Sequence, residues 1–251
     1  MRVARKVVIL IGDEGGLGAV ISDGLSVRPG SDLSREQSSL QLSLENYGVK
    51  DPGVSCSLIH FNDRCGSPQV LIILVPNFEP PVAACAVNEI LTTVISENSS
   101  ELPIIVVPIF QPSLKISQEP KKPKLFDNRV AIFGVEIGLV TDTTQAMLSG
   151  IPKPPSSLRL SCETSACLLQ MIRVLNIPSL LIGTSIGQPD ISAKAEDIQV
   201  RIFSILVFLC RSKWIGEFLA NCTGLSFSKG KTNWIEREKS RSQEPWRALY
   251  G

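Results

Sequence analysis

The sequence predicts an α/β fold of three layers, in which a largely parallel β-sheet is flanked by helices on both faces and followed by a flexible C-terminal tail. Short runs of apolar, often β-branched residues alternate along the chain with segments of helical period. The runs are apolar at consecutive positions, as in strands that are buried on both faces of a helix-covered sheet. With 43% hydrophobic and 20% charged residues, the 251-residue chain is expected to fold.

The first part of the chain is predicted to contain one strand, one helix and a polar excursion. The apolar run Val7–Ile11 ends at Gly12 and predicts a buried strand, and Leu17–Leu25 is predicted to be helical. Residues 28–53 are rich in polar residues, glycine and proline. We expect them to leave the core, with one short helix near Glu36–Tyr47.

Apolar runs bounded by turn residues predict four more strands before residue 136, together with one helix of approximate helical period. The strands are Val54–Phe61, Gln69–Val75, Leu102–Phe110 and Val130–Val135, and the helix is Val82–Ile95. Between the last two strands, Ser113–Asp127 carries four lysines and two prolines. Its length and composition predict a solvated loop that could face a partner. Ile137–Leu148 is expected to be short and irregular or helical.

The second half of the chain predicts a helix, a strand and a long helix. Apolar residues recur at helical spacing in Ser161–Leu175, with Ser161 as N-cap and Asn176 as a left-handed stop. Ile177–Ile182 predicts a buried strand, and Asp190–Cys222 a long helix. Residues 1–222 are therefore expected to form a single α/β domain, and residues 223–251 a polar, basic tail.

Composition limits the classes of partner and the cellular compartment. The formal net charge is +1, so no bulk field would recruit nucleic acid or an anionic membrane. Seven cysteines without a CxxC spacing or a Cys/His cluster disfavour a zinc site or a secreted disulfide framework, and we expect reduced, largely buried thiols. The apolar run after Lys6 is too short for a secretory signal. A cytoplasmic or nuclear protein without metal or cofactor is expected.

The sequence contains few residues in patterns typical of catalytic sites, and no catalytic residue is assigned. His60 is the single histidine, so any Ser/His or Cys/His nucleophile would have to use it. It ends an apolar run beside Phe61, where a structural histidine is the simpler interpretation. Glu136 and Glu163 stand alone at the edges of ordered segments, where a carboxylate more often caps a helix or meets its dipole than acts as a base.

A glycine-rich loop after the first strand leaves a second interpretation open. It lacks the third glycine of a dinucleotide-binding fingerprint, and Asp13 and Glu14 would oppose an anion. Backbone N–H groups at a helix start nevertheless bind phosphate whatever the side chains. The candidate anion-binding residues are Gly12, Gly15, Gly16 and Gly18.

The last three residues form a candidate partner-binding motif. Leu249, Tyr250 and Gly251 combine an apolar anchor, an aromatic ring with a polar tip and, at the end of this sequence, a carboxylate. Capture of a C-terminal carboxylate is a known mode of peptide recognition, and tyrosine is enriched among residues that dominate binding energy.

Three segments resemble the proteasome-assembly-chaperone family. Arg5–Gly12 followed by Gly15–Ser22 is similar to the family's opening strand, loop and small-residue helix. Ser165–Ile182 is similar to its unit of a helix, an Ile-Pro step and a strand. The ending Leu249-Tyr250-Gly251 resembles the hydrophobic–Tyr–X ends that such chaperones insert between α subunits of the proteasome ring.

The resemblance implies a binding protein, whose partners are proteasome α subunits and a paralogous assembly chaperone that completes a heterodimer. It implies that Leu249 fills an apolar slot, Tyr250 packs at its rim and the Gly251 carboxylate pairs with a lysine. Two tails on one heterodimer would raise the effective concentration of each. The alternative, from the shared fold plan, is a phosphorylase- or mutase-like enzyme with a phosphate site at the glycine loop.

Overall fold

The protein is described by a computed structural model that covers residues 4–12, 16–49, 53–95, 102–109, 130–155, 158, 160, 162–186 and 197–228. The strands are β1 (Lys6–Ile11), β2 (Leu25–Ser26), β3 (Ser34–Gln41), β4 (Ser55–Asn62), β5 (Pro68–Val75), β6 (Ile104–Ile109), β7 (Val130–Ile137), β8 (Ser179–Ile186) and β9 (Ser226–Phe227). The helices are α1 (Leu17–Gly24), α2 (Val82–Ile95), α3 (Asp142–Met147), α4 (Glu163–Val174) and α5 (Asp197–Thr223), with a 3₁₀ turn at Glu45–Tyr47.

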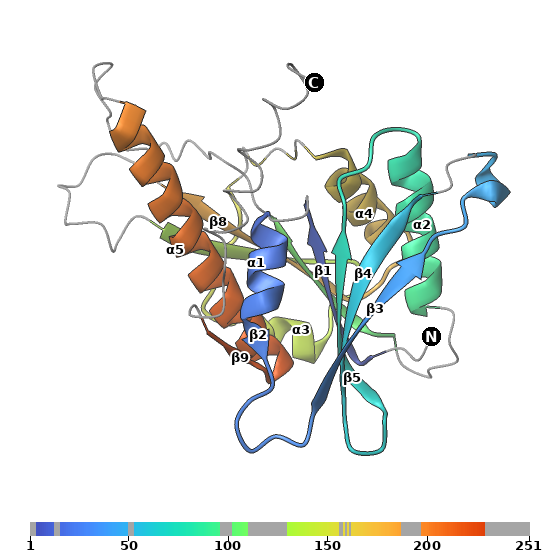
Figure 1. The fold of residues 1–251 in the computed structure, drawn as a ribbon, viewed down its shortest axis with the longest axis horizontal. Coiled ribbons are helices and arrows are strands. Elements are labelled where there is room, and N and C mark those ends of the chain that lie inside the picture. Colours follow the sequence, from blue (N-terminus) through green and yellow to red (C-terminus); the bar gives the residue numbers. More distant parts are fainter. Residues whose placement is uncertain are drawn as a thin grey trace, which may run out of the picture.

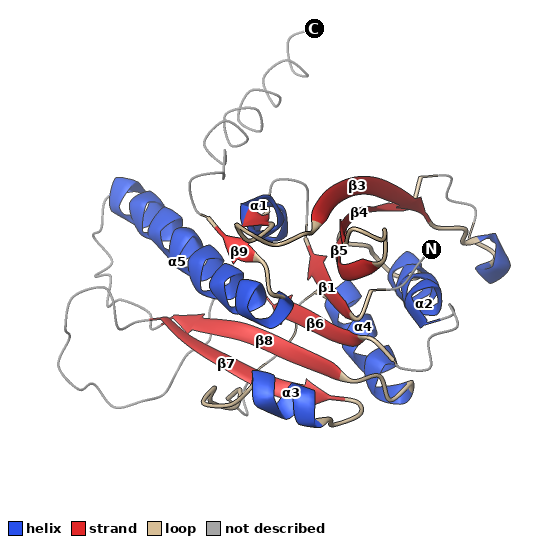
Figure 2. Cartoon of the chain, turned by 90° about the horizontal axis from the view of Figure 1, so that it is seen from below, coloured by secondary structure: helices blue, strands red, loops and turns tan. Residues whose placement is uncertain are grey.

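The predicted α/β architecture is confirmed. Within the described residues, seven strands form one sheet in the order β3-β4-β5-β1-β6-β8-β7 (Figures 1 and 2). The four central strands β5, β1, β6 and β8 are parallel to one another. The outer pairings β3–β4, β4–β5 and β7–β8 are antiparallel, so the sheet is mixed, with β3 running in the direction of the central strands.

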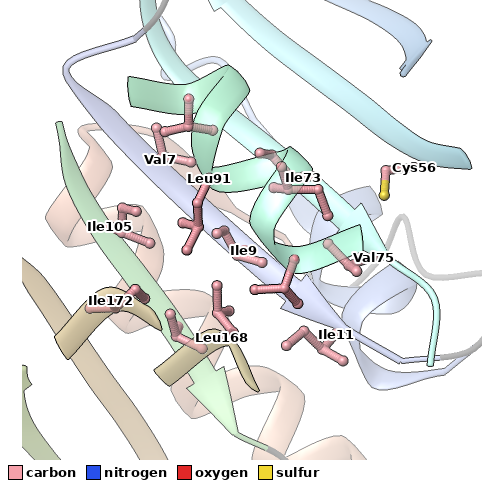
Figure 3. Packing of buried hydrophobic residues seen from close by; sticks show 14 of the residues in the cluster. Val7, Ile9, Ile11, Cys56, Ile73, Val75, Leu91, Ile105, Leu168 and Ile172 are labelled. Atoms are coloured by element: carbon pink, nitrogen blue, oxygen red, sulfur yellow. The ribbon is translucent and has the colours of Figure 1, made fainter. Parts of the chain in front are cut away.

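Helices cover both faces of the sheet, and each face has its own apolar core. On one face, α2 and α4 pack on the odd-numbered residues of β1, including Val7 and Ile9 (Figure 3). On the other, α1 and α5 pack on the even-numbered residues, including Val8 and Leu10. Alternate residues of one strand thus enter different cores, which explains why the run is apolar at every position.

The prediction for residues 28–53 was wrong in its main element. The segment forms the eight-residue strand β3, antiparallel to β4, and the helical content is the single 3₁₀ turn Glu45–Tyr47. Seven residues of β3 are exposed and Leu40 is partly buried, so no apolar alternation reveals the strand. Pairing with β4, not burial, holds this sequence extended.

The unit α4–β8 follows the prediction, apart from its first cap. The helix begins at Glu163, and its N-cap is Cys162, which makes no side-chain capping bond. Cys162 therefore occupies the N-cap position that was predicted for Ser161, and Ser161 itself lies outside the described residues. Asn176 has a φ of 52°, which confirms the left-handed stop.

The chain stays packed past the predicted start of the tail. Leu225 is buried, and β9 pairs with β2 through Leu25 and Phe227. A Cβ atom on Gly24 or Gly216 would overlap the ring of Phe227, so the ring lies between the end of α1 and the C-terminal half of α5. The division into residues 1–222 and 223–251 stays a prediction, but residues as far as Ser228 belong to the folded body.

Some predicted elements lie partly or wholly outside the described residues. These are the basic loop Ser113–Asp127, the first residues of the helix predicted at Asp190–Cys222, and the tail beyond Ser228. Among the residues that the structure describes, no helix is long and apolar enough to cross a membrane.

Candidate functional site

The predicted partner-binding residues Leu249, Tyr250 and Gly251 lie outside the described residues, which end at Ser228, here called the exit point. Directly after β9, Ser228 donates its backbone N–H to the carbonyl of Gly24 at 2.9 Å. The exit point is therefore fixed beside the end of α1. Twenty-one residue steps separate Ser228 from Leu249, which limits the reach of the motif to about 70–75 Å for a fully extended chain.

The glycine loop is only partly available to an anion. Gly12 donates its N–H to the carbonyl of Val75 at 3.0 Å, so this amide is occupied by the backbone. A Cβ on Gly18 would lie 3.2 Å from the Cβ of Leu10, so this glycine lets α1 approach β1 closely. Gly16 is the N-cap of α1, and Gly15 lies outside the described residues.

What remains of the candidate anion site is the start of α1. The helix has no side-chain capping bond and no acidic residue in its first turn, and it begins beyond the carboxyl end of β1. Bare N–H groups at a helix start can attract an anion, but they give no specificity for a substrate. The three described glycines, Gly12, Gly16 and Gly18, therefore do more for chain geometry than for a reaction.

His60 lies in a small polar group on the β3–β4 pair. It stands opposite Glu36, which accepts a hydrogen bond from Nδ2 of Asn62 at 3.0 Å. Partial burial lowers the pKa of His60, and the negative charge of Glu36 opposes that shift. The sequence could not bring Glu36 and His60 together, because the polar strand that carries Glu36 was not predicted.

The two isolated carboxylates have structural roles. Glu163 is the first residue of α4, where its charge faces the positive end of the helix dipole, as predicted. Glu136 accepts a hydrogen bond of 2.6 Å from the hydroxyl of buried Thr144. Thr144 also forms a capping box with Thr141 at the start of α3. Glu136 thus anchors a helix end.

All seven cysteines are free, but fewer are buried than predicted. Cys56 and Cys222 are buried, Cys65 is exposed, and the other four are partly exposed. Burial raises the pKa of Cys56 to about 12 and that of Cys222 to about 11, the latter opposed by the charge of Lys6. These two thiols stay protonated at neutral pH, which suits packing and not nucleophilic chemistry.

An exposed apolar feature was missed by the sequence interpretation. Val174 is one of the apolar residues of the predicted helix Ser161–Leu175, yet its side chain is 72% exposed, and Leu175 beside it is also exposed. The signal was present: Val174 follows the buried Ile172 by two positions, and residues two apart do not share a helix face. Three other exposed apolar residues belong to the same end of the sheet: Leu102, Leu139 and Val140.

Comparison with known proteins gives one family match. A family model described as "Domain of unknown function (DUF7894)" matches residues 1–251. No curated protein matches the chain. Among solved structures, a protein of unknown function from Corynebacterium glutamicum ATCC 13032 aligns with a TM-score of 0.53 and 9% identity, over 96% of this chain and 84% of that chain. At this identity the likeness shows the fold alone.

Other solved structures with similar folds include homologues of proteasome-assembly chaperones. PbaA of Pyrococcus furiosus, described as an archaeal homolog of proteasome-assembly chaperone, aligns with a TM-score of 0.48 and 14% identity, over 99% of this chain and 92% of that chain. PbaB of the same organism, described as an archaeal proteasome activator, gives 0.49 and 10%, over 100% and 96%. At TM-scores below 0.5 these alignments are too loose to assign a role.

Proposed function

The chain belongs to the DUF7894 family, and from its residues and fold we propose that it is a non-catalytic chaperone for assembly of the proteasome core particle. It would bind the α-subunit ring through its α/β body and through Leu249, Tyr250 and Gly251. A paralogous chaperone of the same fold would complete a heterodimer and supply a second tail. It would act in the cytoplasm, or also in the nucleus.

One observation carries the proposal: the segments that resemble the assembly chaperones form the units that the resemblance implies. Arg5–Gly12 contains the strand β1, and Gly15–Ser22 contains most of the helix α1. Ser165–Ile182 contains most of α4, the Ile177-Pro178 step and the first half of β8. The two units are neighbours in the sheet, since β1 and β8 pair with the same strand, β6.

In the proposed contact, each of three adjacent residues has a different role. Leu249 would enter an apolar slot, Tyr250 would pack on its rim and hydrogen-bond there, and the carboxylate of Gly251 would meet a lysine. Ordering a tail costs entropy, so one tail alone binds weakly. Attachment to a body that also contacts the ring, and to a second tail, raises the effective concentration.

Binding of the purified chain to recombinant proteasome α subunits tests this proposal. Deletion of Leu249–Gly251 is expected to weaken binding, and Tyr250→Ala to weaken it about thirtyfold, as at a hot spot. The matched control is Tyr47→Ala, because the chain has two tyrosines and Tyr47 lies on the body, where it bonds to Glu89 and Asn88. Tyr47→Ala should leave binding unchanged.

Addition of one residue after Gly251 separates the carboxylate from the side chains. If the carboxylate pairs with a lysine, the extended chain should bind as weakly as the deletion variant, with the side chains of Leu249 and Tyr250 intact. Equal binding by the full, truncated and extended chains, all with the same circular dichroism spectrum, would reject the tail mechanism. Absence of any binding to α subunits would reject the function.

A further inference from the structure

Five of the seven large apolar residues that are exposed in the described part of the chain gather at one end of the sheet. We name this surface the apolar end: it consists of Leu102, Leu139, Val140, Val174 and Leu175. They come from three segments far apart in the sequence. Leu102 precedes β6, Leu139 and Val140 follow β7, and Val174 and Leu175 precede β8.

Strand register brings these segments together. Ile137, the last residue of β7, pairs with Ser179, the first residue of β8, and Ile105 of β6 pairs with the same Ser179. Figure 2 shows β6, β8 and β7 side by side. Between the strands, Gly138 lies so close to Ile177 that a Cβ would overlap its carbonyl oxygen. The loops after β7 and before β6 and β8 therefore share one end of the sheet.

The exposure of these side chains is large enough to require an explanation. Val174 is 72% exposed and Val140 is 50% exposed, at positions where polar residues would be tolerated. Single exposed apolar residues are ordinary, but a group on one surface marks an interaction site. The two other exposed large apolar residues, Tyr47 and Trp214, belong to different elements.

Two of the charges beside the apolar end, Arg173 and Asp142, are complementary to each other. Arg173 stands in the last turn of α4, which packs on the sheet face of Leu168 and Ile172. Asp142 stands in the first turn of α3, whose end packs on the opposite face through Met147. The apolar end thus has a positive charge beside one sheet face and a negative charge beside the other. Within the described residues neither charge makes an ion pair.

We propose that the apolar end binds a second copy of this chain. The two copies are related by a two-fold axis that lies in the plane of the sheet and runs perpendicular to the strands. This rotation turns the sheet over, so the α4 side of one copy lies against the α3 side of the other. Arg173 of each copy then meets Asp142 of the other copy, while the apolar end of one copy faces the apolar end of the other. Such an interface is isologous, and its charges fix the orientation of the two subunits.

The proposal concerns the chain alone and does not rest on the proposed function. Its test is sedimentation velocity of the full chain from 1 to about 100 µM, a range that covers ordinary protein affinities. The wild-type chain should form a dimer. Val174→Glu should weaken dimerisation about a hundredfold, because it buries an unpaired charge in the contact. Trp214→Glu, which places the same charge on an exposed apolar residue of α5, should leave the dimer unchanged.

A charge exchange tests the orientation. Arg173→Asp and Asp142→Arg should each weaken the dimer about tenfold, and the double variant should recover to within about threefold of wild type. All substituted side chains are exposed, so thermal unfolding should confirm an intact fold in each variant.

Three results would overturn the proposal. A wild-type chain that is monomeric at about 100 µM would leave the surface to another occupant, such as a paralogous subunit. A dimer that Val174→Glu does not weaken would place the contact elsewhere. A monomer in which Val174→Glu speeds proteolysis of residues 229–251 would show that the chain's own C-terminal segment covers the apolar end.

Discussion

The ring of Phe227 shows how one side chain holds separate elements of this fold together. It occupies space that is free because positions 24 and 216 are glycines, one at the end of α1 and one within α5. Glycine within a helix costs about 1 kcal/mol relative to alanine. Because glycine has no side chain, the ring of Phe227 from β9 can reach the helix backbone at position 216. The ring thereby joins α1, α5 and β9 at one point.

Gly216→Ala is expected to destabilise the protein by about 1–3 kcal/mol, because the added methyl group displaces the ring and outweighs the gain in helix propensity. Urea unfolding followed by circular dichroism measures the change. In a Phe227→Leu background the same substitution should cost less than in wild type, since the two positions are coupled. An alanine variant more stable than wild type would contradict this arrangement.

The thiols should differ sharply in reactivity. At pH 8, iodoacetamide should modify the exposed Cys65 first, while Cys56 and Cys222 stay unmodified until the chain unfolds, because both are buried and protonated. Peptide mass spectrometry of the native and urea-unfolded protein distinguishes the sites. Modification of Cys56 in the native state at the rate of Cys65 would show that β4 is not covered as described.

The same two buried thiols, Cys56 and Cys222, are expected to lower the free energy of unfolding at alkaline pH. Their folded-state pKa values, about 12 and about 11, lie above the ordinary 9.0. Unfolding therefore favours the deprotonated forms, and the stability that the buried thiols contribute is fully present below pH 9 and is lost as the pH rises toward 11 and 12. Denaturation midpoints should fall across this range, and Cys56→Ala should reduce the pH dependence.

At the scale of elements, the apolar strands and helices could be predicted and the polar strand could not. The strands β1, β4, β5 and β6 and the helix α2 follow the apolar runs closely, because burial on the sheet determines where those residues lie. β3 carries no such pattern and depends on pairing with a partner distant in the sequence. Local composition indicates neither the strand nor the group that it forms with His60.

The end of α4 gives a prediction at this scale. Asn176 adopts a left-handed conformation that allows the chain to turn from α4 into β8. Asn176→Ala should destabilise the protein by about 1 kcal/mol, whereas Asn176→Gly should be neutral or slightly stabilising, since glycine adopts this conformation without a steric penalty. Thermal unfolding compares the two variants. Equal loss in both would mean that the asparagine side chain, and not its backbone conformation, matters.

For the whole molecule, sequence could predict the layers but not the order of the strands. The order places β1 between β5 and β6, although these two strands follow it by many residues. Nothing in the runs themselves distinguishes a central strand from its neighbours. The clustering of exposed apolar residues at the apolar end depends on the same order, so no reading of the separate segments could have found it.

Strand order predicts a gradient of backbone protection. Amides of β1 have paired strands on both sides and helices on both faces, so we expect them to exchange hydrogen only on global unfolding, which costs about 5–15 kcal/mol. The exposed edge strand β3 should exchange first among the strands of the sheet. Hydrogen-exchange mass spectrometry can test this gradient. Protection of β3 equal to that of β1 would contradict the described edge.

The anchoring of β9 has a mechanical consequence. Any force applied to the segment beyond Ser228 reaches the body through two paired residues of β9 and the ring of Phe227. That attachment is much weaker than the long helix before it, so we expect a load to detach β9 while α5 stays folded. Release of the Phe227 ring at low force would add a few residues to the segment beyond the body. The protein could then follow a moving partner while its domain stays folded.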